Sequence, residues 1–265
     1  MDLSRLTDAL PRLLYAVGQS ELLPRLPTAA QSARSKSPGE IVTAADLAAE
    51  AVLTAALAEL TPGAVIVGEE AAHADPSLLS GLDVPPLLWL VDPLDGTRHF
   101  AEGHGPFGIM VALLVHGRCE AAWIHLPLSA DTAAAWRGRG ATWNGQPIRI
   151  PAPATTPLRG GLLTRFMPPE MRARADELDF LERTDGAHHC AARRYLDVLR
   201  GDEHVSAYWR TLPWDHVPGA LLVQEAGGRV ARFDGSSFDA ADVEGTGLIV
   251  AANAALWERT RTALA

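Results

Sequence analysis

Trp89-Leu90-Val91-Asp92-Pro93-Leu94-Asp95-Gly96-Thr97 is the segment that says most about the fold and the chemistry of this chain. Its apolar first half predicts a buried strand, which delivers two carboxylates at its C-terminal end. Pro93 fixes one backbone angle between them, and Gly96 allows a tight turn. Because close carboxylates repel each other unless cations lie between them, the pattern indicates a site for Mg2+, which prefers oxygen ligands. The alternative is an ordinary turn with Asp and Gly in their usual places.

Further acidic residues stand at the ends of other predicted elements. Glu69 and Glu70 directly follow a short apolar strand, Asp215 precedes a long helical run, and Asp46 opens another helix. Taken alone, Asp215 is better explained as a helix N-cap, and the alternative for Asp46 is a surface carboxylate. Together with the segment at 89–97, these residues favour a shared metal site over separate structural roles.

Composition limits the classes of protein that fit. The 265 residues are 48% hydrophobic, enough for one large domain or two smaller ones. A formal net charge of -9 argues against a nucleic-acid polymer as partner, since such a binder carries a basic stripe. Cys119 and Cys190 lack the paired spacing of a disulfide framework or a zinc site. The N-terminus lacks the apolar core of a signal peptide, and no stretch approaches the roughly 20 apolar residues of a membrane span, so we expect a cytoplasmic protein without membrane attachment.

Hydrophobic periodicity changes at a proline-rich segment, residues 151–157. We predict an N-terminal α+β half, residues 1–150, that carries the metal-binding motifs and contains an antiparallel meander. A C-terminal α/β half, residues 151–265, alternates strands with helices and completes the active site. The polar stretch 34–40 is predicted to be a loop. The predicted helices are 3–18, 44–61, 168–181, 190–200, 215–226 and 253–264, and the predicted strands are 64–67, 87–91, 107–115, 119–125, 132–137, 160–164, 205–209, 229–232 and 247–251.

These motifs resemble those of the inositol monophosphatase family, which belongs to a superfamily of Mg2+-dependent, lithium-sensitive phosphatases. The matching blocks, in the family's order, are Lys36 with Val42-Thr43 and Asp46, then Glu69-Glu70, then Asp92 to Thr97, and then Trp214-Asp215 with Glu225 to Gly228. The resemblance runs from about residue 36 to the C-terminus. It implies a layered α-β-α-β-α sandwich with the active site between the two halves.

The resemblance also implies how two or three Mg2+ ions are held in each active site. Glu69, Asp92 and the Leu94 carbonyl hold the first ion. Asp92, Asp95 and Asp215 hold the second, so that Asp92 bridges the pair. A third, weaker ion is expected near Glu69. Two cations roughly 3.5–4 Å apart activate a water molecule and stabilise the departing oxygen of a phosphate monoester.

The catalytic residues implied by the resemblance are Thr97, Asp46 and Glu69. A water molecule on the first ion is the nucleophile, and Thr97 hydrogen-bonds it. Asp46 orients and polarises the Thr97 hydroxyl. The backbone N–H groups of Gly96 and Thr97 receive the phosphate at the start of a helix, whose dipole adds to the attraction, and Asp95 adds a substrate contact.

Four further residues are predicted around this centre. Glu70 is expected to orient ligands and bound water, and Lys36 to lie near the metals, although a loop lysine is usually solvated. Cys190 is predicted to be a small buried side chain that opens a helix near the substrate. Arg210 follows a strand after which similar inositol phosphatases carry a Glu that contacts substrate hydroxyls. If Arg210 faces the cleft, the substrate carries a second anionic group; the alternative is that Arg210 points to solvent or pairs with an acid.

The activity implied is Mg2+-dependent hydrolysis of a small sugar or polyol phosphate, such as inositol 1-phosphate. Alternatives within the superfamily are a 3'(2'),5'-bisphosphate nucleotidase, a fructose-1,6-bisphosphatase and a histidinol-phosphatase. The alternative outside it is a regulatory binding protein that retains the fold, against which the intact acidic set argues. The family is commonly dimeric and a C2 dimer is the commonest soluble oligomer, so we expect a homodimer.

Overall fold

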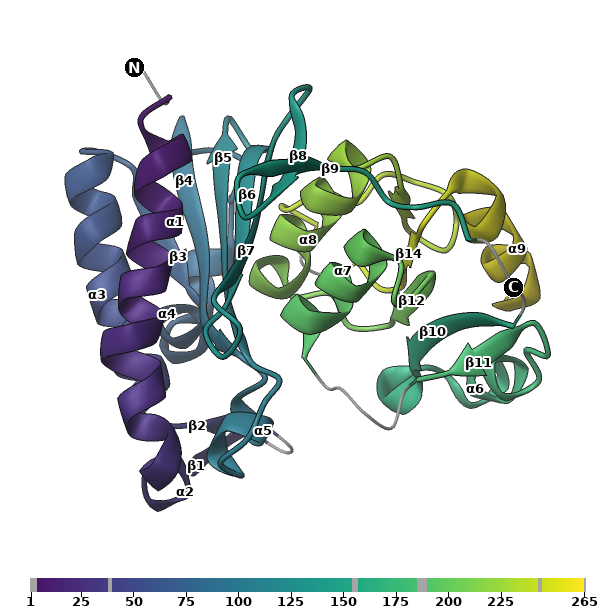
Figure 1. The fold of residues 1–265 in the computed structure, drawn as a ribbon, viewed down its shortest axis with the longest axis horizontal. Coiled ribbons are helices and arrows are strands. Elements are labelled where there is room, and N and C mark those ends of the chain that lie inside the picture. The colour runs from purple at the N-terminus through teal and green to yellow at the C-terminus, as the bar shows by residue number, and fades with distance from the viewer. Residues whose placement is uncertain (1–3, 38–39, 154–156, 185–189, 243–244, 265) are drawn as a thin grey trace.

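A computed structural model describes residues 4–37, 40–153, 157–184, 190–242 and 245–264 of the chain. Its elements form five layers, which confirms the expected α-β-α-β-α sandwich (Figure 1). From one side to the other, the layers are helices α1 (Leu6–Val17) and α3 (Ala44–Leu60), a seven-stranded sheet, helices α7 (Ala191–Arg200) and α8 (Pro213–Glu225), a five-stranded sheet, and helices α6 (Pro169–Asp176) and α9 (Ala254–Leu264).

The larger sheet positions the acidic motifs. Its first two strands are parallel and the remaining pairs are antiparallel. In sheet order, its strands are β3 (Val65–Gly68), β4 (Leu87–Asp95), β5 (Gly108–Val115), β6 (Arg118–Leu126), β7 (Asp131–Trp136), β8 (Gly140–Trp143) and β9 (Gln146–Ile148).

Strand β4 is buried on both faces, which explains its continuous apolar sequence. Successive side chains of a strand point to opposite faces. Trp89 and Val91 belong to the core cluster that includes α1 and α3, whereas Leu88 and Leu90 belong to the cluster that includes α7 and α8. The strand is therefore fixed from both sides, and its C-terminal carboxylates are fixed with it.

The smaller sheet combines parallel and antiparallel pairs. Strand β10 is parallel to its two neighbours, and the other two pairs are antiparallel. In sheet order, its strands are β11 (Leu181–Arg183), β10 (Leu158–Leu163), β12 (Val205–Tyr208), β14 (Leu248–Ala251) and β13 (Arg229–Ala231). Helices α7 and α8 belong to the C-terminal part of the chain but also pack on the larger sheet, so both sheets share this central layer. The division at 151–157 stays a prediction, and residues 154–156 lie outside the described residues.

Two predicted elements are wrong. The expected loop at 34–40 contains strand β1 (Arg34–Ser37), which pairs with β2 (Glu40–Val42) as an antiparallel hairpin. The pairing joins backbone groups of a polar segment, so hydrophobic alternation gave no signal for it. The expected helix at 168–181 ends at Asp176, and β11 follows. Only Ala175 of α6 is buried, whereas Leu181 pairs with Leu158 at the edge of the smaller sheet. Among the described residues, no helix combines the length and the apolar character that crossing a membrane requires.

Candidate active site

The C-terminal end of β4 forms the tight turn that the sequence predicts. Asp92 is buried, and its Oδ1 accepts a hydrogen bond of 3.0 Å from the Leu94 backbone N–H. Gly96 has φ of +85°, and a Cβ at this position would lie 2.7 Å from the Pro106 carbonyl oxygen. Only glycine satisfies both the left-handed backbone and the close approach. Helix α5 (Thr97–Ala101) begins directly after it.

Three carboxylates from separate elements converge beside this turn. Glu69 begins α4 (Glu69–Ala74), Asp92 lies in β4 and Asp215 lies in the first turn of α8. One oxygen from each lies within 4.8 Å of the other two. Burial raises the pKa of Asp92 well above its ordinary value, and the charges of Glu69, Asp95 and Asp215 raise it further. Such mutual repulsion is relieved by cations, so the arrangement fits a metal site.

Asp95 connects the turn to the start of α7. Its Oδ2 accepts a 2.6 Å hydrogen bond from the Ala192 backbone N–H and one of 3.0 Å from the Cys190 thiol. Burial raises the pKa of Asp95 to about 6, although these hydrogen bonds oppose the shift. Asp95 is not one of the three carboxylates that lie within 4.8 Å of one another. Cys190 is the small buried residue that the sequence predicts at the opening of a helix.

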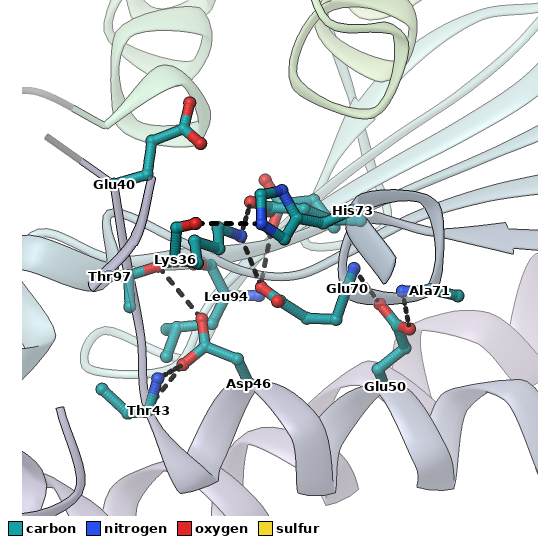
Figure 2. Close-up of polar contacts among 12 residues, drawn as sticks. Lys36, Glu40, Thr43, Asp46, Glu50, Glu70, Ala71, His73, Leu94 and Thr97 are labelled. Carbon is teal, nitrogen blue, oxygen red and sulfur yellow. Dashed lines mark hydrogen bonds and ion pairs between the residues drawn. The ribbon is translucent and has the colours of Figure 1, made fainter. Parts of the chain in front are cut away.

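Thr97 and Asp46 form the expected pair (Figure 2). The Thr97 Oγ1 lies 3.0 Å from Asp46 Oδ1 and 2.9 Å from the Leu94 carbonyl oxygen. The second oxygen of Asp46 accepts hydrogen bonds from the Thr43 backbone N–H at 2.8 Å and from the Thr43 hydroxyl at 2.6 Å. Burial raises the pKa of Asp46 to about 6, and the bonds from Thr43 oppose this rise. Asp46 is 1% exposed, so it is not the surface carboxylate of our alternative interpretation.

Lys36 lies in the same site and forms ion pairs with two carboxylates. Its ammonium group contacts Glu69 and lies 2.7 Å from Glu70 Oε1. Burial alone lowers the pKa of Lys36, but the two carboxylates outweigh it and raise the pKa above its ordinary value. Burial likewise raises the pKa of Glu70 to about 7, which the bond from Lys36 partly offsets. Hairpin β1–β2 therefore contributes a cation directly beside Glu69.

Our reading of the sequence missed Glu50, which holds the start of α4. Its two carboxylate oxygens accept hydrogen bonds of 2.9 Å from the backbone N–H groups of Glu70 and Ala71 (Figure 2). A Cβ on Gly68 would lie 2.3 Å from this carboxylate, so the contact requires glycine. The available signal was the spacing: Glu50 follows Asp46 by one helical turn, which puts both acids on one face of α3.

Arg210 pairs with an acid, as in the alternative given for it. Its guanidinium contacts the Glu40 carboxylate of β2 and lies 4.8 Å from the centre of the Phe166 ring. Burial and the Glu69 charge raise the pKa of Asp215, and Arg210 partly opposes that rise. The ion pair therefore connects the hairpin to the C-terminal part of the chain and still acts on the acidic cluster.

Known proteins are similar to this chain in sequence and in fold. The chain matches the inositol monophosphatase family over residues 2–265. The Nus factor SuhB of Pseudomonas aeruginosa is 34% identical over an alignment of 218 residues, and the match covers 77% of each chain. The chloroplastic phosphatase IMPL1 of Arabidopsis thaliana is 32% identical over an alignment of 221 residues, and the match covers 78% of this chain and 57% of its own.

The solved structures show the same fold at lower sequence identity. SuhB of Bartonella henselae superposes with a TM-score of 0.82 at 22% identity, covering 98% of both chains. The IMPase of Thermotoga maritima superposes with a TM-score of 0.81 at 23% identity, covering 98% of this chain and 96% of its own. With the family matched over nearly the whole sequence and the fold shared, the chain belongs to the inositol monophosphatase family.

Proposed function

We propose that the protein is a Mg2+-dependent phosphomonoesterase that hydrolyses a small sugar or polyol phosphate of the inositol 1-phosphate type. The observation that carries this proposal is the convergence of Glu69, Asp92 and Asp215 within 4.8 Å beside the Thr97–Asp46 pair. Carboxylates this close repel one another unless cations lie between them. A cluster of oxygen ligands next to a hydroxyl–carboxylate pair suits hydrolysis of a phosphate ester.

The donor set fits Mg2+, because it consists of carboxylate and carbonyl oxygens. Glu69, Asp92 and the Leu94 carbonyl would hold one ion, and Asp92, Asp95 and Asp215 a second, with a third near Glu69. When bound, these ions lower the pKa of a water molecule and neutralise charge on the departing oxygen. Lys36 and Glu70 orient the Glu69 side of the site through their ion pair.

The protein's own groups prepare the attacking water and hold the phosphate. The Thr97 hydroxyl donates its proton toward Asp46 and keeps lone pairs free to accept a hydrogen bond from the water. Through Oδ1, Asp46 is placed to accept proton density from the Thr97 hydroxyl. The N–H groups of Gly96 and Thr97 stand at the start of α5, where they can receive phosphate oxygens.

The test is phosphate release from a panel of substrates. Inositol 1-phosphate, a 3',5'-bisphosphate nucleotide, fructose 1,6-bisphosphate and histidinol phosphate are compared with Mg2+ and with excess EDTA. We expect turnover only with Mg2+, inhibition by Li+, and a loss of at least about a hundredfold in kcat for Asp92→Asn. Asp234→Asn, which changes an exposed acid, serves as the matched control. Full activity in EDTA or in Asp92→Asn contradicts the proposed mechanism.

A second candidate is a regulatory binding protein, because several relatives carry the name Nus factor. If the folded protein binds Mg2+ but releases no phosphate from any member of the panel, this candidate replaces the first. We further propose that the partner is a small phosphorylated molecule rather than a nucleic acid or a membrane. The homodimer and the cytoplasmic location stay predictions; a monomer in light scattering at micromolar concentration would reject the dimer.

A further inference from the structure

A second group of metal-binding side chains lies at the other end of α5, outside the acidic cluster. His99, Glu102 and His104 each offer one ligand atom, and these three atoms lie within 4.8 Å of one another. The end of the helix brings them together. Gly103, with φ of +81°, donates to the Phe100 carbonyl at 2.9 Å, and the His104 N–H donates to the His99 carbonyl at 3.0 Å. This glycine-terminated helix end folds His104 back beside His99, with their ring centres 5.2 Å apart.

The hydrogen bonds of His104 determine which of its nitrogen atoms faces the group. Its Nδ1 lies 2.8 Å from the Gly105 carbonyl oxygen. Because a carbonyl only accepts, Nδ1 carries the hydrogen, and in the neutral ring Nε2 carries a lone pair. When one ring nitrogen of a histidine binds a metal ion, the other ring N–H usually donates to a carbonyl or carboxylate oxygen, which orients the ring.

Nε2 of His104 lies 3.1 Å from Glu102 Oε2, so two acceptors face each other in the neutral ring. Such a contact is favourable only when a cation, either a proton or a metal ion, lies between them. Two ligands held at about 2.0–2.1 Å by one tetrahedral ion lie about 3.3 Å apart, close to the observed separation. The separation fits a shared metal ion as well as a shared proton.

The ligand types select the metal. Two imidazoles and one carboxylate suit Zn2+, whereas Mg2+ takes oxygen ligands. The side chains of Glu102 and His104 are 53% and 54% exposed, so an ion can enter from solvent and keep a water molecule in its fourth position. We propose that His99, Glu102 and His104 form a Zn2+ site, separate from the acidic cluster.

Of the three side chains, His99 lies in the five-residue helix that begins with Thr97, and Glu102 and His104 follow the end of that helix. Helix α5 packs against β2 and against the short helix α2 (Ala29–Ser32), on the side of the molecule that carries the β1–β2 hairpin (Figure 1). Zn2+ bound at the end of α5 ties that end to the loop after it. The ion therefore holds in place the element that presents Thr97.

The test is Zn2+ binding by the full chain, measured calorimetrically in excess Mg2+. Asp92→Asn is the parent in every measurement, because it weakens Zn2+ binding by the acidic cluster. We expect one Zn2+ per chain in the parent and an affinity at least about tenfold weaker after Glu102→Gln or His104→Asn. His116→Asn changes an exposed histidine outside the group and is expected to bind like the parent.

X-ray absorption at the zinc edge gives an independent measurement. We expect scattering from two imidazole rings in the parent and from one after His104→Asn, while circular dichroism confirms that each variant is folded. Equal Zn2+ affinity in the parent and in both folded variants, or a zinc spectrum without imidazole, would overturn the proposal. Absence of Zn2+ binding in the parent would overturn it as well.

Discussion

The two carboxylate oxygens of Asp46 have separate partners, so this side chain both caps a helix and contacts Thr97. Its Oδ2 completes the capping box of α3 with Thr43, and its Oδ1 pairs with Thr97. From the sequence, Asp46 was expected to polarise Thr97 or to be a surface carboxylate, and its capping role was not predicted. Because the cap fixes the side chain before any substrate arrives, the orientation of the Thr97 hydroxyl is set by the fold.

We expect Thr97→Val to lower kcat by about 10²–10⁴-fold, since valine keeps the shape of threonine but cannot contact the attacking water. Substrate binding depends on other groups, so KM should change much less. Steady-state kinetics on the best substrate of the panel measures both constants. Thr97→Ser restores the hydroxyl and should retain most of the activity. A Thr97→Val variant that is as active as Thr97→Ser would show that the hydroxyl has no catalytic role.

Glu50 allows a prediction about positioning. In Glu50→Gln, the side chain retains one acceptor for the two N–H groups of Glu70 and Ala71, so one of these groups loses its partner. We expect the free energy of unfolding to fall by about 1–3 kcal/mol in urea titrations, and kcat to fall because Glu69 is no longer held in register. Glu59→Gln, an exposed position on the same helix, is the control. Unchanged stability and activity in Glu50→Gln would contradict this role.

At the scale of the elements, apolar patterns predicted the structure best. Strand β4 was predicted from its continuous apolar sequence, which reflects burial on both of its faces. In the C-terminal part, the buried residues of α9 recur at helical spacing, whereas α8 is buried along most of its length. The β1–β2 hairpin was not predicted, because it is polar and held by backbone pairing. In the site, the turn at 92–97 follows from local sequence. The contacts of Glu50 and Glu40 do not, since their partners are distant in sequence.

We expect the ion pair between Arg210 and Glu40 to restrain the β1–β2 hairpin. Arg210→Ala removes both the charge and the stacking on Phe166, so β2 loses this ion pair with the C-terminal part of the chain. We expect faster amide hydrogen exchange over β1 and β2, residues 34–37 and 40–42, measured by mass spectrometry, with unchanged exchange in the β4 peptide. Arg118→Ala, which breaks an exposed pair with Glu120, is the control. Unchanged exchange in the hairpin would show that the pair does not restrain it.

For the whole molecule, we expect the burial of His125 to make the free energy of unfolding depend on pH. Its Nδ1 lies 2.8 Å from the Thr132 hydroxyl, and burial lowers the pKa of His125 from 6.5 to about 4. Between these pH values the unfolded chain binds more protons than the folded one. The free energy of unfolding therefore falls as the pH drops through this window, by about 3 kcal/mol at most from this group.

Urea unfolding of the protein and of His125→Asn at pH 7 and at pH 4.5 measures this contribution. We expect His125→Asn to lose less stability between the two pH values than the unmodified protein loses. The exposed His116, changed to Asn, should leave the loss as large as in the unmodified protein. An equal loss in the unmodified protein and in His125→Asn would show that another group controls the acid sensitivity.

The convergence of Glu69, Asp92 and Asp215 has a consequence for folding kinetics. These residues come from α4, β4 and α8, so the chain must close long loops before they meet, and their charges oppose the last approach. During refolding, the tryptophans of the core, among them Trp89 and Trp123, should reach their native fluorescence before metal binding recovers. A divalent cation that binds only the native arrangement then slows unfolding, so the lifetime of the folded protein is set partly by the ion concentration around it.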